Sequence, residues 1–156
     1  MKQRIFVIIT LFFVLLISMA FTPKEKKVLI IGDSISIGYT TYVKEALSGK
    51  AQVFHNPGNA QHSGVGLKNI REWIGGNDWD VIQFNWGLWD LCYRSPVSKV
   101  QGNRDKINGK ITLSVEEYKT NLDSIVSILK RETTAQLLFV TTTFVPEDEE
   151  GRFYED

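Results

Sequence analysis

One short stretch near the start of the chain narrows the folds that it can adopt. Residues 27–31 read Lys-Val-Leu-Ile-Ile, and this mostly apolar run stops abruptly at Gly32-Asp33-Ser34. Over residues 35–47, which follow the turn, apolar side chains recur at helical spacing. A buried strand, a tight turn and the start of a helix are therefore expected, as in the first unit of a parallel α/β sheet.

The rest of the sequence repeats this alternation of strands and helices. Further strands are expected at 51–55, 80–85 and 136–141, and further helices at 65–74 and 115–131. Ser114 and Glu117 form a capping box at the start of the last helix. This order predicts an α/β fold with a doubly wound parallel sheet, a flavodoxin-like three-layer α/β/α arrangement with strand order 2-1-3-4. The loops after the first three strands then converge on one crevice.

The amino-terminal residues have the pattern of a cleavable export signal. Lys2 and Arg4 precede an apolar run over 5–17, and Ser18-Met19-Ala20 is a small-x-small cleavage site. An uncleaved anchor is the alternative, because the apolar run could nearly span a bilayer. Export would place the protein in the periplasm or outside a bacterial cell. The expected division is a signal peptide at 1–20, a tether at 21–26 and one folded domain at 27–156.

Charge and cysteine content argue against several kinds of partner. The 18 basic and 18 acidic side chains balance, and loss of Lys2 and Arg4 with the signal leaves a small net negative charge. The composition therefore gives no indication of nucleic-acid binding, or of a stable membrane partner after signal cleavage. The single cysteine, Cys92, cannot form an internal disulfide and is expected to be buried and unreactive.

Ser34 is a candidate nucleophile, because it follows a strand and starts a helix at the predicted crevice. A serine needs a base to take its proton and donors to hold the oxyanion that forms. Its own N–H at the helix start, the N–H of Gly58 and the side-chain amide of Asn85 could be such donors. The alternative is that Ser34 only caps the helix.

Two segments carry a family resemblance. Residues 31–35, Ile-Gly-Asp-Ser-Ile, resemble the first sequence block of the SGNH/GDSL hydrolases, a family of serine esterases and lipases. Residues 56–60, Asn-Pro-Gly-Asn-Ala, resemble the second block. The resemblance implies that Ser34 is the nucleophile and that Gly58 gives an oxyanion-hole N–H. Asp33 is expected to hold the turn by hydrogen bonds.

The third block of that family, Gly-x-Asn-Asp, is matched only in part. Gly87 and Asp90 agree with it as supporting residues, but Trp89 stands where the family has its oxyanion asparagine. An indole N–H is also a donor, and Asn85 precedes the block by two residues. Either Asn85 or Trp89 could therefore supply the third donor.

No stretch matches the fifth block, Asp-x-x-His, which gives the family its catalytic acid and base. The chain has two histidines, His55 and His62, both before the third expected strand. His62 could be a substitute base, whereas His55 is expected to be structural; their spacing fits no metal site. We expect the natural protein to continue through a fifth strand and this block. The 156-residue chain is expected to be weakly active or inactive, and no cofactor is expected.

The resemblance and the export signal together imply an exported ester hydrolase. Its substrate would be a small-molecule or polysaccharide ester, and removal of acetyl groups from carbohydrate is the first expectation. Trp86, Trp89 and Tyr93 are expected near the crevice, either binding sugar or packing. The long basic connection over 91–113 is either a substrate-binding segment or a solvated loop.

Two other classes of function compete with the esterase. A non-catalytic flavodoxin-like module could bind carbohydrate or an anion through the loop after the first strand. A phosphatase with Asp33 as nucleophile is disfavoured, because Ile35 stands where a second aspartate is expected.

Overall fold

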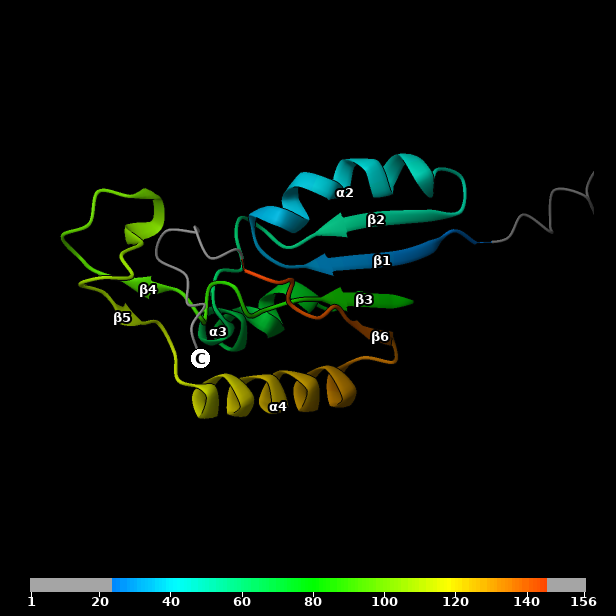
Figure 1. The fold of residues 1–156 in the computed structure, drawn as a ribbon. Helices are drawn as coiled ribbons and strands as arrows, with labels where there is room; N and C mark the ends of the chain where they lie inside the picture. The colour runs from blue at the N-terminus through cyan, green and yellow to red at the C-terminus, as the bar shows by residue number, and fades with distance from the viewer. Residues whose placement is uncertain (1–23, 146–156) are drawn as a thin grey trace, which may run out of the picture.

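The protein is described by a computed structural model that covers residues 24–145. Four parallel strands form its central sheet in the order β2-β1-β3-β6, as predicted (Figure 1). Their bounds are Lys26–Ile31 for β1, Ala51–His55 for β2, Val81–Phe84 for β3 and Gln136–Phe139 for β6. The doubly wound α/β fold is thereby confirmed.

Three helices cover the two faces of the sheet. In Figure 1, α2 (Ser34–Ala46) lies on one face, whereas α3 (Ser63–Ile74) and α4 (Val115–Glu132) lie together on the other. The expected capping box begins α4: Ser114 N donates to Glu117 Oε2 at 2.8 Å, and Glu117 N donates to Ser114 Oγ at 3.2 Å.

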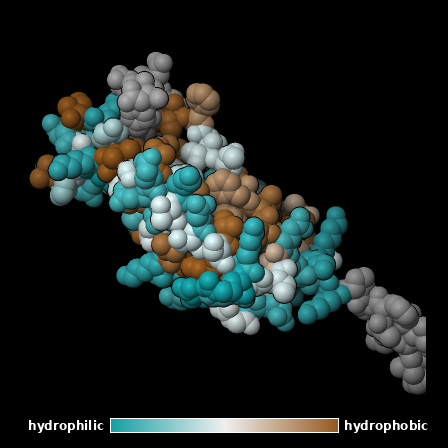
Figure 2. Space-filling model, turned by 90° about the horizontal axis from the view of Figure 1, so that it is seen from below, coloured by the Kyte–Doolittle hydropathy of each residue, from teal (hydrophilic) through white to brown (hydrophobic). Residues whose placement is uncertain are grey.

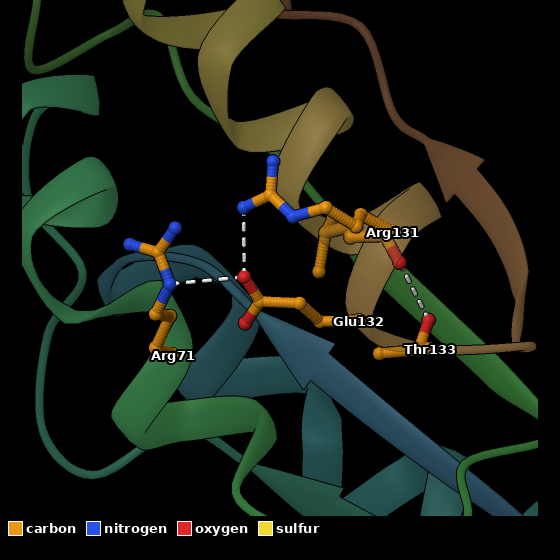
Figure 3. Close-up of polar contacts among 5 residues, drawn as sticks. Arg71, Arg131, Glu132 and Thr133 are labelled. Atoms are coloured by element: carbon orange, nitrogen blue, oxygen red, sulfur yellow. Dashed lines mark hydrogen bonds and ion pairs between the residues drawn. The ribbon is translucent and has the colours of Figure 1, made fainter.

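An exposed ionic contact joins the carboxyl-terminal ends of α3 and α4. Arg71 Nε lies 3.0 Å from Glu132 Oε1, and Arg131 Nη2 lies 2.8 Å from the same atom (Figure 3). Pairs this exposed contribute about 1 kcal/mol or less. Seen from below, the surface mixes hydrophilic and hydrophobic residues (Figure 2). Because the exposed ion pairs contribute so little, the two helices are held mainly by the apolar residues that they bury against the sheet.

Tryptophans complete the core on the α3 and α4 side. Trp79 packs edge-on against Phe54 with ring centroids 5.3 Å apart, and its indole donates to Ile74 O at 2.7 Å. Trp86 is 1 % exposed, and a Cβ at Gly66 would lie 2.3 Å from its ring. A glycine on α3 therefore makes room for the Trp86 indole. Of the two roles considered for Trp86, sugar binding or packing, the structure shows packing.

The basic connection after β3 has structure of its own. It contains a two-stranded antiparallel ribbon, β4 (Tyr93–Arg94) and β5 (Lys110–Ile111), and a short 3-10 helix η1 (Gln101–Asn103). Figure 1 places this segment at the end of the sheet where the parallel strands finish, next to the start of α2. It therefore borders the crevice predicted from the strand order.

Strand β1 begins one residue earlier than predicted, at Lys26 instead of Lys27. Lys26 N donates to Lys50 O at 3.2 Å, and Lys27 N donates to Asp80 Oδ2 at 2.8 Å. The expected signal peptide and the first half of the tether, residues 21–23, lie outside the described residues. An acidic run at residues 147–150, expected from its composition to be a solvated loop, lies outside them as well. Within residues 24–145, none of the helices is long and apolar enough to cross a membrane.

Candidate active site

Ser34 is the first residue of α2, and a different side chain caps that helix. The N-cap is Asp33, whose Oδ1 accepts from Ile35 N at 2.9 Å. This hydrogen bond confirms the turn-holding role expected for Asp33. Ser34 is exposed, and within residues 24–145 no hydrogen bond engages its hydroxyl group. The Ser34 hydroxyl is therefore not used for capping.

A solvent-open pocket of about 250 Å³ lies beside Ser34. It sits at the carboxyl ends of β1 and β3, where the strand order reverses. Its lining comes from the start of α2, from the loops after β2 and β3, and from the segment around η1: Ser34, Asn59, Leu88, Trp89, Arg94, Gln101, Gly102 and Arg104. Ser34 and Trp89 thus lie at the same pocket, as the sequence analysis expected.

Asn56 joins the loop after β1 to the loop after β2. Its Oδ1 accepts from Gly32 N at 2.9 Å, and its Nδ2 donates to Gly58 O at 3.2 Å. A backbone hydrogen bond from Ala60 N to Gly32 O, 3.0 Å long, also joins these two loops. Gly58 has a φ of +65°, in the region that favours glycine. Gly58 does not line the pocket, but its neighbour Asn59 does.

Asn56→Ala is expected to lower the free energy of unfolding by about 2 kcal/mol, because it leaves the buried Gly32 N–H without an acceptor. Urea unfolding of both proteins measures this difference. The control is Asn77→Ala, which truncates an exposed asparagine in another loop and should cost about 0.5 kcal/mol or less. An equal loss of unfolding free energy in the two variants would show that the Asn56 side chain stabilises the protein no more than an exposed asparagine does.

Of the two candidates for the third oxyanion donor, only Trp89 lies at the pocket. Its ring stacks under the guanidinium of Arg94, with Arg94 Cζ 4.0 Å from the ring centroid. Asn85 does not line the pocket, and its Nδ2 donates to Val140 O at 2.5 Å, just after β6. The Asn85 amide, one of the two donors expected for the oxyanion, is therefore bound to the residue that follows β6.

Asp90 ties the loop after β3 to the start of α3. It is 2 % exposed, and its Oδ1 accepts from Ser63 N at 2.8 Å and from Ser63 Oγ at 2.5 Å. Asn121 Nδ2 on α4 donates to the same Ser63 hydroxyl at 3.1 Å. Burial raises the pKa of the Asp90 carboxyl, although the two bonds from Ser63 act in the opposite direction. Asp90 thus holds the loop after β3 against the start of α3.

Neither histidine of the chain lines the pocket beside Ser34. His55 Nδ1 lies 2.7 Å from Asn56 O, and because a carbonyl only accepts, this nitrogen carries a proton. His55 Nε2 lies 2.7 Å from the Ser36 hydroxyl, which is 3 % exposed. His55 is therefore structural, as expected. His62 is the N-cap residue of α3, and its buried Nδ1 has no hydrogen-bond partner in the described part of the chain.

Crystal structures of two proteins share this fold. One is a provisionally named acylhydrolase from Bacteroides fragilis NCTC 9343, which is 19 % identical with a TM-score of 0.52. The other is an acetyl xylan esterase, which is 16 % identical with a TM-score of 0.53. The matches cover 76 % and 71 % of this chain, but only 51 % and 56 % of those two chains. At these identities the likeness is one of fold. No protein-family model matches the sequence, and neither does any curated protein.

The remaining site expectations concern aromatic residues, cysteine and metals. The three residues of the predicted aromatic cluster do not all lie at the pocket. Trp86 is buried, and its Nε1 donates to Ala60 O at 3.4 Å. Tyr93 pairs with Ile111 in the ribbon, so Trp89 alone of the three lines the pocket. Cys92 is buried, as expected. Across residues 24–145, no group of three metal-ligating side chains comes together.

Proposed function

We propose that this chain carries the nucleophile and oxyanion-binding part of an exported serine ester hydrolase of the SGNH/GDSL type. The observation that supports it best is the Ser34 hydroxyl, exposed at the start of α2 beside a pocket while Asp33 caps the helix. The fold shared with an acylhydrolase and an acetyl xylan esterase agrees with this function.

In the proposed reaction, Ser34 Oγ attacks the carbonyl carbon of an ester. The Ser34 proton goes to a base, and the negative charge on the carbonyl oxygen is held by the Ser34 N–H and by Trp89 Nε1, both from residues that line the pocket. The family resemblance adds the N–H of Gly58, whose neighbour Asn59 lines the pocket. The C–O bond to the alcohol then breaks, and the alcohol leaves with a proton. Water then attacks the acyl-serine, the bond from the acyl carbon to Ser34 Oγ breaks, the carboxylic acid leaves, and a proton restores the Ser34 hydroxyl group.

No described residue that lines the pocket is a candidate for the general base of this mechanism. His55 contacts Ser36, and His62 is absent from the pocket lining. The sequence also holds no match to Asp-x-x-His. We therefore expect ester turnover by the 156-residue chain to be slow, with the remaining rate coming from the oxyanion donors.

The proposed substrate class is an acylated carbohydrate, with acetyl as the first acyl group to test. Three features support it: the fold shared with an acetyl xylan esterase, the export signal expected at residues 1–20, and the indole of Trp89 at the pocket. Aromatic faces suit sugar rings, because their C–H edges pack on an apolar plane.

Covalent labelling tests the nucleophile without requiring turnover. The full chain is incubated with a fluorophosphonate probe, and the modified peptide is identified by mass spectrometry. Labelling should be slow, because no base among the described residues lines the pocket to activate the hydroxyl group, so an excess of probe and a long incubation are used. We expect the adduct on Ser34, with at least about a tenfold loss of labelling in Ser34→Ala. Ser48→Ala is the matched control, because Ser48 is an exposed serine just beyond the other end of α2. Equal labelling of the two serines would overturn the proposal.

A non-catalytic carbohydrate-binding module is the second candidate, favoured by the lack of a histidine at the pocket. Such a module would bind sugar without hydrolysing an ester and would show no adduct at Ser34. Sugar binding without labelling therefore selects the module, and labelling at Ser34 selects the hydrolase.

A further inference from the structure

We propose that the exposed face of α2 binds a linear, neutral sugar chain and leads it to the pocket beside Ser34. The ligand is a polysaccharide or a long oligosaccharide with flat-faced sugar rings, and Tyr42 is the aromatic residue on which a ring stacks. That the bound chain carries an ester rests on the function proposed for Ser34, whereas the binding of the chain rests on the surface of α2 alone.

A single row of exposed residues on α2 leads away from the pocket. Ser34, Gly38 and Tyr42 follow one another at intervals of four residues, so they lie on the same side of the helix. The buried residues of α2, Ser36 and Thr40, lie on the other side, against the sheet (Figure 1). The row extends about 12 Å along the helix axis, because each residue adds about 1.5 Å. A surface of this length that begins at the Ser34 pocket suits a chain of sugar rings better than a single ring.

Gly38 stands in the middle of this row, where the packing does not require a glycine. A Cβ at this position would meet nothing within 4 Å in the described part of the chain, and the backbone is helical, so an alanine would fit. Glycine in a helix interior is less favourable than alanine, because it loses more backbone freedom on folding. The glycine therefore weakens α2 and leaves a shallow hollow between Ser34 and Tyr42. A sugar ring can approach the helix backbone closely at such a position.

The side chains at the two ends of this face are large and apolar in character. Tyr42 is 72 % exposed, and Ile35, which stands at the pocket end of the same face, is 52 % exposed. An exposed aromatic ring offers a flat surface on which the C–H face of a sugar ring packs. The hydroxyl groups of Tyr42 and of its exposed neighbour Thr41 can hydrogen-bond to the hydroxyl groups of the sugar. Tyr42 is therefore the residue to which we assign the stacking contact.

The lack of charge on this part of α2 indicates a neutral ligand. Residues 34–43 contain no acidic or basic side chain, and the first charged residue of the helix is Lys44. Acidic residues are favoured in the first turn of a helix, but α2 has none there. The solvent-facing side of a surface helix usually carries charged residues. An uncharged face with hydroxyl groups and an aromatic ring instead matches an uncharged sugar chain, and it would not attract nucleic acid or an anionic membrane.

The test compares a long and a short form of one sugar chain. Cellohexaose and cellobiose are built from the same β-linked glucose units, and NMR titration of the full chain measures both dissociation constants. We expect cellohexaose to bind about tenfold tighter or more, with amide shifts along α2 as well as beside Ser34. Tyr42→Ala should weaken cellohexaose binding about fivefold or more, whereas Tyr42→Phe, which keeps the ring, should retain most of the affinity.

Gly38→Ala separates ligand binding from a structural role of the same surface. The alanine should raise the urea midpoint of unfolding, because it is the better helix former. It should nevertheless weaken cellohexaose binding about threefold or more, because its methyl group fills the hollow and keeps the sugar ring away from the helix. A Gly38→Ala protein that binds cellohexaose as tightly as the wild type would contradict the proposed path of the chain.

Lys44→Ala is the matched control, because Lys44 is an exposed residue of the same helix that lies outside the row. The variant should bind cellohexaose as the wild type does. Equal binding of the two sugars by the wild type, or equal effects of Tyr42→Ala and Lys44→Ala, would overturn the inference. Ser34 labelling is scored separately: labelling without a preference for the longer sugar overturns only the surface on α2, and a preference without labelling overturns only the hydrolase.

Discussion

Replacing Gly87 by alanine should destabilise the protein by about 3 kcal/mol or more. Gly87 has a φ of +150°, which L residues rarely adopt, and a Cβ there would lie 1.9 Å from Thr142 Oγ1. The substitution therefore combines backbone strain with a steric clash. Because Gly87 begins the loop that carries Trp89 and Asp90, the same change should disturb the wall of the Ser34 pocket.

Thr142 cannot move aside freely, because it helps to hold the preceding residue. Thr142 Oγ1 donates to Trp86 O at 3.0 Å, and Tyr118 OH on α4 donates to the same carbonyl at 2.9 Å. An alanine at residue 87 would push the threonine hydroxyl away from this carbonyl. The expected cost thus includes a weakened hydrogen bond in addition to the clash.

Urea unfolding of Gly87→Ala, Thr142→Ala and the double variant separates the two causes. Removing the Thr142 hydroxyl group relieves the closest contact, although Thr142 Cβ stays 3.0 Å from the added Cβ, and it leaves the backbone strain unchanged. The double variant should therefore lose less stability than the sum of the single variants. Gly76→Ala is the control, because a Cβ at Gly76 meets nothing within 4 Å. A Gly87→Ala protein as stable as Gly76→Ala would refute the steric argument.

The order of the sheet could be predicted because it depends on patterns that are local in sequence. Strand β1 is one apolar run ended by glycine, and α4 has a capping box and one apolar face, so each is identifiable without its neighbours. The alternation of such elements then allows few topologies. This is why the strand order and most element bounds agree with the structure to within a few residues.

The contacts around Ser34 could be predicted only in part, because they join distant parts of the chain. Ser34 and Trp89 follow the ends of β1 and β3, so topology alone brings them to one pocket. The bond from Asn85 to Val140 spans 55 residues and depends on side-chain direction, which no sequence pattern encodes. The stacking of Arg94 on Trp89 likewise requires the ribbon of β4 and β5, whose two-residue strands carry no recognisable sequence pattern.

Asp90→Ala should lower the free energy of unfolding by about 3 kcal/mol, because it removes the acceptor of two buried donors, Ser63 N and Ser63 Oγ. Asp90→Asn keeps one oxygen to accept both bonds. The amide nitrogen of the asparagine takes the place of Asp90 Oδ2, which has no hydrogen-bond partner in the described part of the chain. Asp90 also lines a cavity of about 80 Å³. We expect this variant to cost about 1 kcal/mol or less, so the pair separates the hydrogen bonds from the charge.

The pH dependence of stability should distinguish the same two proteins. Burial raises the pKa of Asp90 above its ordinary value of 3.8, so between these two values the folded protein binds more protons at this site than the unfolded chain does. Stability from this group is therefore present at low pH and is lost as pH rises through the window. Urea midpoints measured from about pH 4 to about pH 7 should fall in the wild type relative to Asp90→Asn, which cannot titrate there. Parallel profiles would show that Asp90 is ionised at its ordinary pKa, and that the interactions from Ser63 outweigh its burial.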